Sequence, residues 1–331
     1  MQTTCAEISV RGRIFNVPAT RIDGRTIVVK GNWIKTASIH DEEWQAEGVD
    51  DPDFILAKLR EQGVKADLFT FAQKLPETKP KFNYHLEWDN LAAISLTTYK
   101  EWWEKRLPQE TRKNVRRAER RGVVVRAVDF DEALAAGIKS IYDETPIRQG
   151  RRFWHYGKTL EAVRRENSSY LDRSEFIGAY YQEQLIGFIK MVYVGKVSIL
   201  MQIVSRNEHY DKRPTNALLA KAVEVSESKG MGYVVYGSYV YGKNNDAPLT
   251  EFKRRNGFEE ILLPRYYIAL TAKGSACLSL NLHRGLRRLL PKKLDSLLLR
   301  ARARMYQGRM STAGASANEN EAGKEAGKQQ D

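Results

Sequence analysis

The chain has 331 residues, of which 42% are hydrophobic and 29% charged, and its formal net charge is +13. These values are typical of a soluble globular protein with a sizeable core. Its two cysteines, Cys5 and Cys277, lie far apart in the sequence, which excludes a disulfide framework and a C-x-x-C metal site. The N-terminus has no apolar signal region, and no run of about eighteen apolar residues occurs, so we expect a cytoplasmic protein.

Residues 1–105 predict an N-terminal α/β subdomain. Apolar and polar residues alternate over 7–36 around Asp23-Gly24, which predicts a β-hairpin. A short amphipathic helix is expected over 52–63, because a proline opens this segment and a glycine closes it. Two further strands, separated by a proline-containing connector, are expected over 66–75 and 91–96.

The next segment carries a high density of positive charge. Two helices are expected that join around Pro108, and residues 105–126 hold nine basic and two acidic side chains. On a helical wheel the cations share one half, whereas Thr111, Val115 and Ala118 share the other. Like charges at this spacing repel each other, so we expect the cationic half to meet an anion, with a solvated surface as the alternative.

Residues 106–272 predict a second α/β domain. Helices are expected over 129–145 and 158–170, and three β-rich runs over 175–205 predict an antiparallel meander. The remaining elements are an amphipathic helix, a strand, a short helix and a last strand, over 213–230, 232–238, 248–258 and 259–271.

The start of the helix over 213–230 is a candidate anion site. Lys212 and Arg213 lie beside the partial positive charge of a helix N-terminus, and Thr215 and Asn216 lie in its first turn. Such an end favours a phosphate or pyrophosphate. Helix capping alone is the alternative role of Thr215 and Asn216.

Residues 144–157, ETPIRQGRRFWHYG, interleave arginines with aromatic residues. This mixture is used to hold phosphates and to stack rings. We therefore assign Arg148 and Trp154 to substrate binding, with an ordinary exposed loop as the alternative. Glu144 is a candidate general base.

The C-terminal part changes in character. Residues 273–310 hold ten basic and one acidic side chain, and their leucines recur every three or four positions, which predicts basic amphipathic helices. Such helices fit an anionic membrane surface, tRNA phosphates or packing onto the body of the protein. Residues 311–331 are small and polar, and we expect them to be disordered.

Several common catalytic motifs are missing from the sequence. The five histidines never stand at ligand spacing, so we expect no metal site. The sequence has no G-x-S-x-G, P-loop or G-x-G-x-x-G motif.

Three motifs carry a resemblance to a known family. TRKNVRRAERRGV, RPTNALLAKAVEVSESKG and EFKRRNGF occur in this order around the predicted meander. Together they resemble the GNAT acyltransferase superfamily and, more narrowly, its FemABX and BioF2-like branch, over about residues 90–270. The resemblance implies an α/β (α+β) fold with a GNAT-like mixed, mostly antiparallel sheet flanked by helices, and a partial GNAT-like subdomain at the N-terminus.

The resemblance also implies a reaction. GNAT enzymes take an acyl group from acyl-CoA, whose pyrophosphate binds the loop and helix end matched here by Tyr210–Leu218, and FemABX enzymes take an aminoacyl group from charged tRNA. We expect transfer from acyl-CoA to an amine of a cell-envelope or surface-glycan precursor, with a phosphorylated or nucleotide-linked acceptor. The alternatives are an aminoacyl-tRNA-dependent peptidyltransferase and a non-catalytic RNA-binding protein. The glycines of the GNAT loop motif Q/R-x-x-G-x-G/A are missing here.

Residues for each role follow from the resemblance and from the charge pattern. Lys253 matches the lysine of the Fem FK motif and is the candidate cation for the carbonyl oxygen, which becomes negative during transfer. Tyr236 stands where many Fem proteins have Asp. Together with Tyr239 and Tyr241 it is a candidate hydrogen-bond donor, with packing as the alternative role of all three. Arg112 and Arg116 of the basic helix are assigned to the phosphorylated substrate. The residues assigned to the co-substrate are Lys212, Arg213, Thr215 and Asn216.

Overall fold

The computed structural model describes residues 4–10, 13–148, 150–241 and 248–284. The described residues up to 270 form one compact unit, and those over 271–284 belong to a second one. The expected basic helices over 273–310 are described only as far as residue 284, and the expected disordered tail over 311–331 lies outside the described residues.

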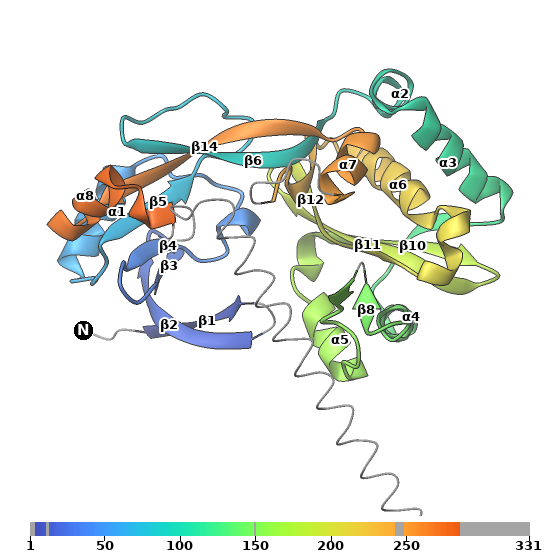
Figure 1. Cartoon of the computed structure of the whole chain (residues 1–331), viewed down its shortest axis with the longest axis horizontal. Coiled ribbons are helices and arrows are strands. Elements are labelled where there is room, and N and C mark those ends of the chain that lie inside the picture. Colours follow the sequence, from blue (N-terminus) through green and yellow to red (C-terminus); the bar gives the residue numbers. More distant parts are fainter. Residues whose placement is uncertain (1–3, 11–12, 149, 242–247, 285–331) are drawn as a thin grey trace, which may run out of the picture. The chain divides into compact units, whose positions relative to one another are not determined.

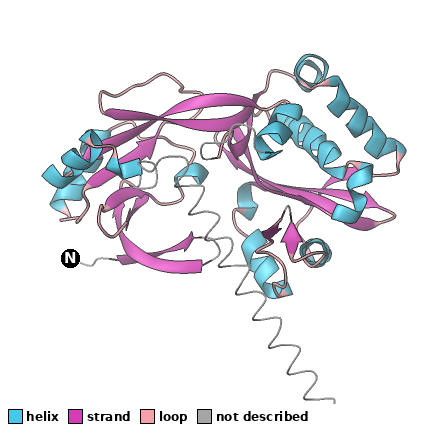
Figure 2. Ribbon diagram, viewed as in Figure 1, coloured by secondary structure: helices cyan, strands magenta, loops and turns pink. Residues whose placement is uncertain are grey.

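A twelve-stranded sheet runs through the first unit (Figures 1 and 2). The strands follow the order β1-β2-β3-β4-β5-β14-β6-β13-β12-β11-β10-β7, and all neighbours are antiparallel except β4–β5 and β12–β13. Their bounds are β1 (Thr4–Val10), β2 (Arg13–Ile22), β3 (Arg25–Lys30), β4 (Thr36–Ile39), β5 (Leu68–Ala72), β6 (His85–Ser95), β7 (Val124–Val128), β10 (Ser174–Tyr181), β11 (Gln184–Val194), β12 (Val197–Ser205), β13 (Tyr233–Ser238) and β14 (Glu259–Ala269). The expected fold class, a mixed and mostly antiparallel sheet flanked by helices, is confirmed.

The helices cover both faces of the sheet. In the half formed by β10–β13, α3 and α6 pack on one face and α4 and α5 lie on the other (Figure 1). The bounds are α1 (Pro52–Glu61), α2 (Tyr99–Glu101), α3 (Gln109–Arg120), α4 (Glu132–Tyr142), α5 (Leu160–Asn167), α6 (Pro214–Ser228), α7 (Pro248–Arg255) and α8 (Ala272–Ser279). The short turns are η1 (Glu42–Trp44), η2 (Trp102–Arg106), η3 (Leu171–Arg173), η4 (Asn207–Lys212) and η5 (Leu282–Arg284).

β6 connects the two halves of the sheet. β6 pairs with β14 on one side and with β13 on the other, so strands from both ends of the first unit meet at its middle. The expected boundary between residues 105 and 106 lies in the helical segment Trp102–Arg106, and strands from both sides of it belong to one sheet.

Several predicted elements are confirmed. The Asp23-Gly24 turn joins β2 to β3, and β10, β11 and β12 form the expected antiparallel meander. In α3 the buried residues are Thr111, Val115 and Ala118, as the helical wheel predicts. The arginines and lysines of α3 thus lie on its outward half.

Three segments differ from the prediction. The helix before Pro108 is a short turn, α2, followed by a π-helical turn, η2, because Leu107 donates its N–H to the Trp102 carbonyl five residues earlier. The expected connector before residue 91 already belongs to β6 from His85 onward, since β14 pairs with it there. The expected loop over 146–157 contains a small hairpin of β8 (Ile147–Arg148) and β9 (Arg151–Arg152).

Among the described residues, no helix combines the length and the apolar character that crossing a lipid bilayer requires.

Candidate functional site

The sheet opens between β12 and β13. These parallel strands pair only where Val197–Ile199 face Tyr233–Val235, although β12 continues to Ser205. β13 also bulges away from β6, because its register shifts between Val235 and Ser238. Beyond Ile199 and Val235 the two strands are no longer paired with each other.

Gly237 is the residue on which this bulge depends. Its φ is +58°, a conformation that favours glycine. A Cβ atom at this position would also lie 2.6 Å from the Tyr241 hydroxyl oxygen. The glycine therefore lets Tyr241 approach the backbone of β13.

Lys253 on α7 points to this bulge. Its side chain is fully buried, and its Nζ donates a hydrogen bond of 2.5 Å to the Ser238 carbonyl. The same Nζ lies 4.8 Å from the centre of the Tyr236 ring and 4.6 Å from that of Tyr241. We call Lys253, Tyr236, Tyr241 and Ser238 the Lys253 group.

Burial sets the protonation states in the Lys253 group. It lowers the pKa of Lys253 to about 8, because a charged ammonium is costly away from water. Burial, with a smaller contribution from Tyr241, raises the pKa of Tyr236 to about 12. At pH 7 the group thus holds a cation beside a neutral phenol, and both can donate hydrogen bonds to a negative oxygen.

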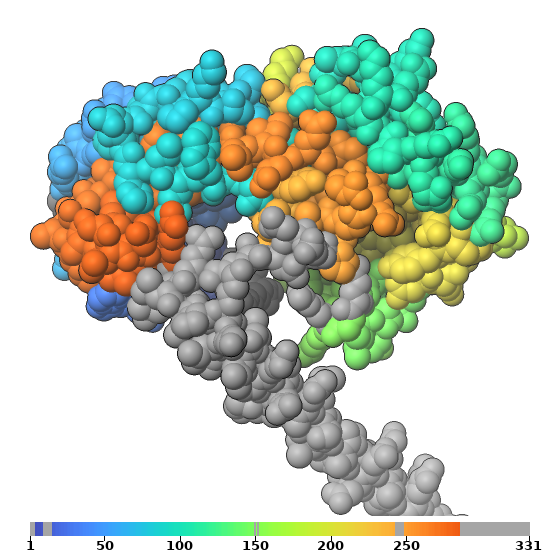
Figure 3. Space-filling view, turned by 45° about the horizontal axis from the view of Figure 1, so that its top comes forward, coloured from blue at the N-terminus to red at the C-terminus, as the bar shows by residue number. Residues whose placement is uncertain are grey.

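Three contacts fix α7 relative to its neighbours. The Thr111 hydroxyl on α3 donates to the Arg255 carbonyl at 2.6 Å, and the Asn216 amide on α6 donates to the Asn256 side chain at 2.9 Å. Gly257 ends α7 with φ +77°, and a Cβ there would lie 2.8 Å from the Trp102 ring nitrogen. In the space-filling view the surface of α2 and α3 adjoins that of α7 (Figure 3).

The first turn of α6 uses most of its polar groups within the protein. Pro214 has no N–H, and Asn216 and Ala217 direct their N–H groups to the Arg213 carbonyl. The Thr215 hydroxyl bonds to that of Ser205 at 2.9 Å. The helix start therefore offers fewer free donors than the sequence suggests.

The two cations at this end differ in their surroundings. Lys212 pairs with Asp211 at 3.5 Å and lies over the Tyr181 ring at 4.6 Å. Arg213 is exposed and takes the left-handed conformation at the N-cap, with φ 57°. Arg121 at the end of α3 reaches the same turn and pairs with Asp211 at 2.8 Å.

The cationic half of α3 borders an open pocket of about 400 Å³. Arg112 donates to the carbonyls of Trp103 and Glu104, at 2.8 and 2.6 Å, and so closes the end of η2. Arg116 is exposed and lies 5.9 Å from the Trp103 ring centre. The pocket is lined by Trp103, Glu104, Gln109, Arg112, Lys113 and Arg116.

Glu144 and Arg148 make their contacts around α4 and the end of β12. Arg148 pairs with Glu144 at 2.9 Å and donates to the carbonyls of Ser205 and Ile141. The other Glu144 oxygen accepts from the Glu208 N–H at 3.1 Å. Both charges thus stabilise the hairpin segment, which weakens their candidacy for general-base and phosphate-binding roles.

Trp154 is 58% exposed, and its ring is tilted against that of His155, with ring centres 3.7 Å apart. His155 packs against Tyr142 on its other side, and burial, with the charges of Lys158 and Arg148, lowers the pKa of this imidazole to about 3. His155 is therefore neutral at pH 7. Trp154 stays available for contact with a ligand.

The structure thus brings Lys253 together with two of the candidate tyrosines, Tyr236 and Tyr241, and adds the Ser238 carbonyl. The Tyr239 backbone accepts from the Thr250 hydroxyl at 3.2 Å and donates to the Asn90 carbonyl, so this residue anchors α7 at the end of β13. Only the Fem-like FK motif could have indicated Lys253 in advance.

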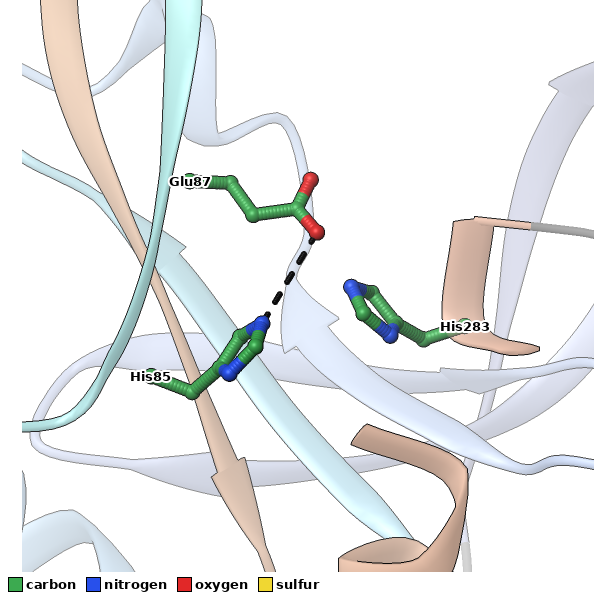
Figure 4. Close-up of side chains that lie close together, drawn as sticks. All are labelled: His85, Glu87 and His283. Carbon is green, nitrogen blue, oxygen red and sulfur yellow. Dashed lines mark ion pairs between the residues drawn. The ribbon is translucent and has the colours of Figure 1, made fainter. Parts of the chain in front are cut away.

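On β6, His85 Nε2 and Glu87 Oε1 lie 3.9 Å apart (Figure 4). His283, which is also drawn there, belongs to the second unit. The expectation that the protein holds no metal stays a prediction.

Comparison with known proteins gives the fold. The sequence matches no family model and no curated protein. The C-terminal domain of a putative lysylphosphatidylglycerol synthetase from Agrobacterium fabrum is similar, with 13% identity and a TM-score of 0.50 over 80% of this chain and 87% of that one. L-PGS from Bacillus licheniformis is similar with 15% identity and a TM-score of 0.51 over 78% and 85%.

FemX is less similar, with 11% identity and a TM-score of 0.44 over 79% of this chain and 87% of that one. The first two likenesses show that this chain shares the fold of those synthetase structures.

Proposed function

We propose that the protein is a GNAT-fold transferase that moves an acyl or aminoacyl group to a nucleophile at the Lys253 group. The observation that carries the proposal is Lys253 itself. Its ammonium is fully buried beside the opening between β12 and β13, and a carbonyl and two tyrosine rings surround it.

The chemistry needs a cation at this place. An amine attacks only after losing its proton, and the carbonyl oxygen of the donor then becomes negative. One well-placed hydrogen-bond donor at that oxygen lowers the barrier by about 2.7 to 4 kcal/mol. The Lys253 ammonium supplies charge as well as hydrogen bonds, and burial keeps water from competing for it.

We propose an aminoacyl ester on tRNA as the donor, with acyl-CoA as the second candidate. The first turn of α6 supports this order, because its N–H groups largely bond within the protein, whereas a CoA pyrophosphate needs them free. One of the similar structures is named as a lysylphosphatidylglycerol synthetase domain, and lysyl is an aminoacyl group. The cation-rich α3 suits the phosphates of a long polyanion.

We assign the pocket at α3 to a phosphate of the substrate. Arg116 and Lys113 are exposed there, and Trp103 offers a ring face. This phosphate belongs either to the tRNA backbone or to a phosphorylated, cell-envelope acceptor. Contact with the anionic membrane surface through residues 273–310 remains part of the proposal for the acceptor.

The test is a donor screen. Charged tRNA, acetyl-CoA and longer acyl-CoAs are added separately to the full chain at about 50 mM salt, with an envelope extract as the source of acceptor. Melting temperature reports binding, and mass spectrometry reports the added aminoacyl or acyl mass. We expect stabilisation and transfer with charged tRNA, and a strong loss of binding at about 200 mM salt.

Each other outcome has a defined meaning. If transfer occurs only from acyl-CoA, the proposed tRNA donor is wrong, and the proposed role of the Lys253 group is unaffected. Binding of uncharged and charged tRNA without transfer from any donor would contradict the enzyme proposal and favour an RNA-binding protein. Transfer at the wild-type rate by Lys253→Met would remove Lys253 from the centre.

A further inference from the structure

A second cavity lies between β2, β3 and the end of α1. Its volume is about 720 Å³, within the range of small-molecule sites, and none of its lining residues belongs to the Lys253 group. The lining consists of Pro18, Ala19, Thr20, Ile27, Val29, Gly31, Lys35, Glu61, Gln62, Gly63, Val64 and Lys65. Five of these residues are aliphatic, five are polar or charged, two are glycines and none is aromatic.

The two walls of the cavity are held by hydrogen bonds. The Thr20 hydroxyl on β2 bonds to the Gln62 side chain after α1, and the Gln62 amide donates to the Arg21 carbonyl at 3.3 Å. The end of α1 is capped by its own chain, because Gly63 and Val64 donate N–H groups to earlier carbonyls at 3.0 Å. The helix end thus presents satisfied backbone groups to the cavity.

The space beside Gly63 is empty. A Cβ atom at this glycine would meet no atom within 4 Å. Ile27, in contrast, is fully buried and closes the cavity from the side of the core. The cavity therefore has an apolar floor and an open part near the end of α1.

The charges around the cavity do not balance. Lys35 and Lys65 are exposed and have no ion pair with any residue that the structure describes. The one carboxylate in the lining, that of Glu61, is bound by Lys58 at 2.8 Å. The lining thus contains two exposed lysines and one carboxylate, which is already paired with a lysine outside the lining.

We propose that this cavity binds a single-chain anionic amphiphile of the fatty-acid class. The alkyl chain packs against Ile27, Val29 and Val64, and the carboxylate lies near Lys35 and Lys65. An alkyl chain fits better than a nucleobase, because the lining offers no ring to stack on. This site is independent of the transfer reaction proposed above.

The experiment titrates the full chain with dodecanoate by isothermal calorimetry. Butyrate has the same head group with a short chain, and dodecyltrimethylammonium has the same chain with a positive head. We expect one dodecanoate per chain and at least about tenfold weaker binding of both comparison compounds. Equal binding of the cationic compound, or no binding of dodecanoate, would overturn the proposal.

Variants locate the site. The double change Lys35→Glu and Lys65→Glu reverses both charges on exposed side chains, and we expect about tenfold weaker binding of dodecanoate. Lys30→Glu is the matched control, because this exposed lysine is close in sequence and does not line the cavity. An equal loss in the control would overturn the proposal.

Vesicles of phosphatidylglycerol distinguish binding of a dissolved fatty acid from binding of a membrane surface. If the chain binds the vesicles but not dissolved dodecanoate, the positive charge recognises a membrane surface and the cavity proposal is wrong.

Discussion

Two buried lysines, Lys190 on β11 and Lys253 on α7, share a property and differ in their surroundings. Burial lowers the pKa of each to about 8. Lys190 donates to three oxygens, namely the carbonyls of Asn167 and Ser169 and the Ser169 hydroxyl. Lys253 donates to one carbonyl among the described residues and otherwise faces tyrosine rings.

The comparison shows why a lowered pKa alone does not mark a reaction centre. An ammonium has three N–H donors. Lys190 uses all three to tie the end of α5 to the sheet, so it has no donor left for a ligand. Lys253 has one acceptor among the described residues, the Ser238 carbonyl, so two of its donors are unused there, and it lies where β12 and β13 separate.

The largest expected effect is a difference in turnover between a Lys253 variant and a Lys190 variant. Lys253→Met keeps the length of the side chain and removes the cation, so we expect transfer to fall about 100- to 1,000-fold. Lys190→Met removes an equally buried charge at a structural position, and we expect turnover within a few-fold of the wild type. Single-turnover assays with the donor identified by the screen measure both. Equal losses of turnover in the two variants would contradict a catalytic role that Lys253 has and Lys190 lacks.

Stability should show the opposite order. Lys190→Met leaves three acceptors without their donor, two of them carbonyls, and we expect a loss of roughly 2 kcal/mol in the free energy of unfolding. Lys253→Met leaves only the Ser238 carbonyl, so the loss should be smaller. Urea unfolding at pH 7 measures both values. A less stable Lys253→Met would indicate that Lys253 is chiefly structural.

The pH dependence of stability should be the same for both sites. Each lysine has a lower pKa when folded than when unfolded, so the unfolded chain binds more protons between about pH 8 and 10.5, and stability rises with pH there. Relative to either methionine variant, the wild type should gain roughly 2 kcal/mol at most between pH 7 and 9.5. Urea titrations at the two pH values give this difference. An unchanged difference would mean that the folded protein does not lower the pKa of the buried lysine, which then stays charged in both states up to pH 9.5.

The smallest effect concerns the support of the Lys253 group. Asn216→Ala removes the hydrogen bond to Asn256 that joins α6 to α7, and we expect about 1 kcal/mol lower stability and a few-fold lower turnover. The concentration of donor needed for half-maximal rate should stay the same. A large rise in that concentration with unchanged stability would instead assign Asn216 to donor binding.

Local features of this fold could be predicted from the sequence. The spacing of Thr111, Val115 and Ala118 gave the buried side of α3, because one helix face needs no knowledge of distant residues. The hairpin at Asp23-Gly24 follows from turn chemistry in the same way. Lys253 itself could be proposed only through the resemblance of its motif.

The remaining features depend on contacts between distant segments. β6 starts at His85 because β14 pairs with it from more than 170 positions later, which no local pattern shows. Arg148 donates to the Ser205 carbonyl, 57 positions later, and this contact has no signal in the local sequence. The approach of Tyr241 to Lys253 depends on the bulge at Gly237, and a bulge leaves little trace in a single sequence.

The most direct test of the central claim is the pH dependence of the transfer rate in wild type and in Lys253→Met. If the Lys253 ammonium stabilises the carbonyl oxygen, the wild-type rate falls as the pH rises through about 8, and the residual rate of the variant lacks this fall. The same alkaline fall in both proteins would contradict the account, because the titrating group would then be another residue.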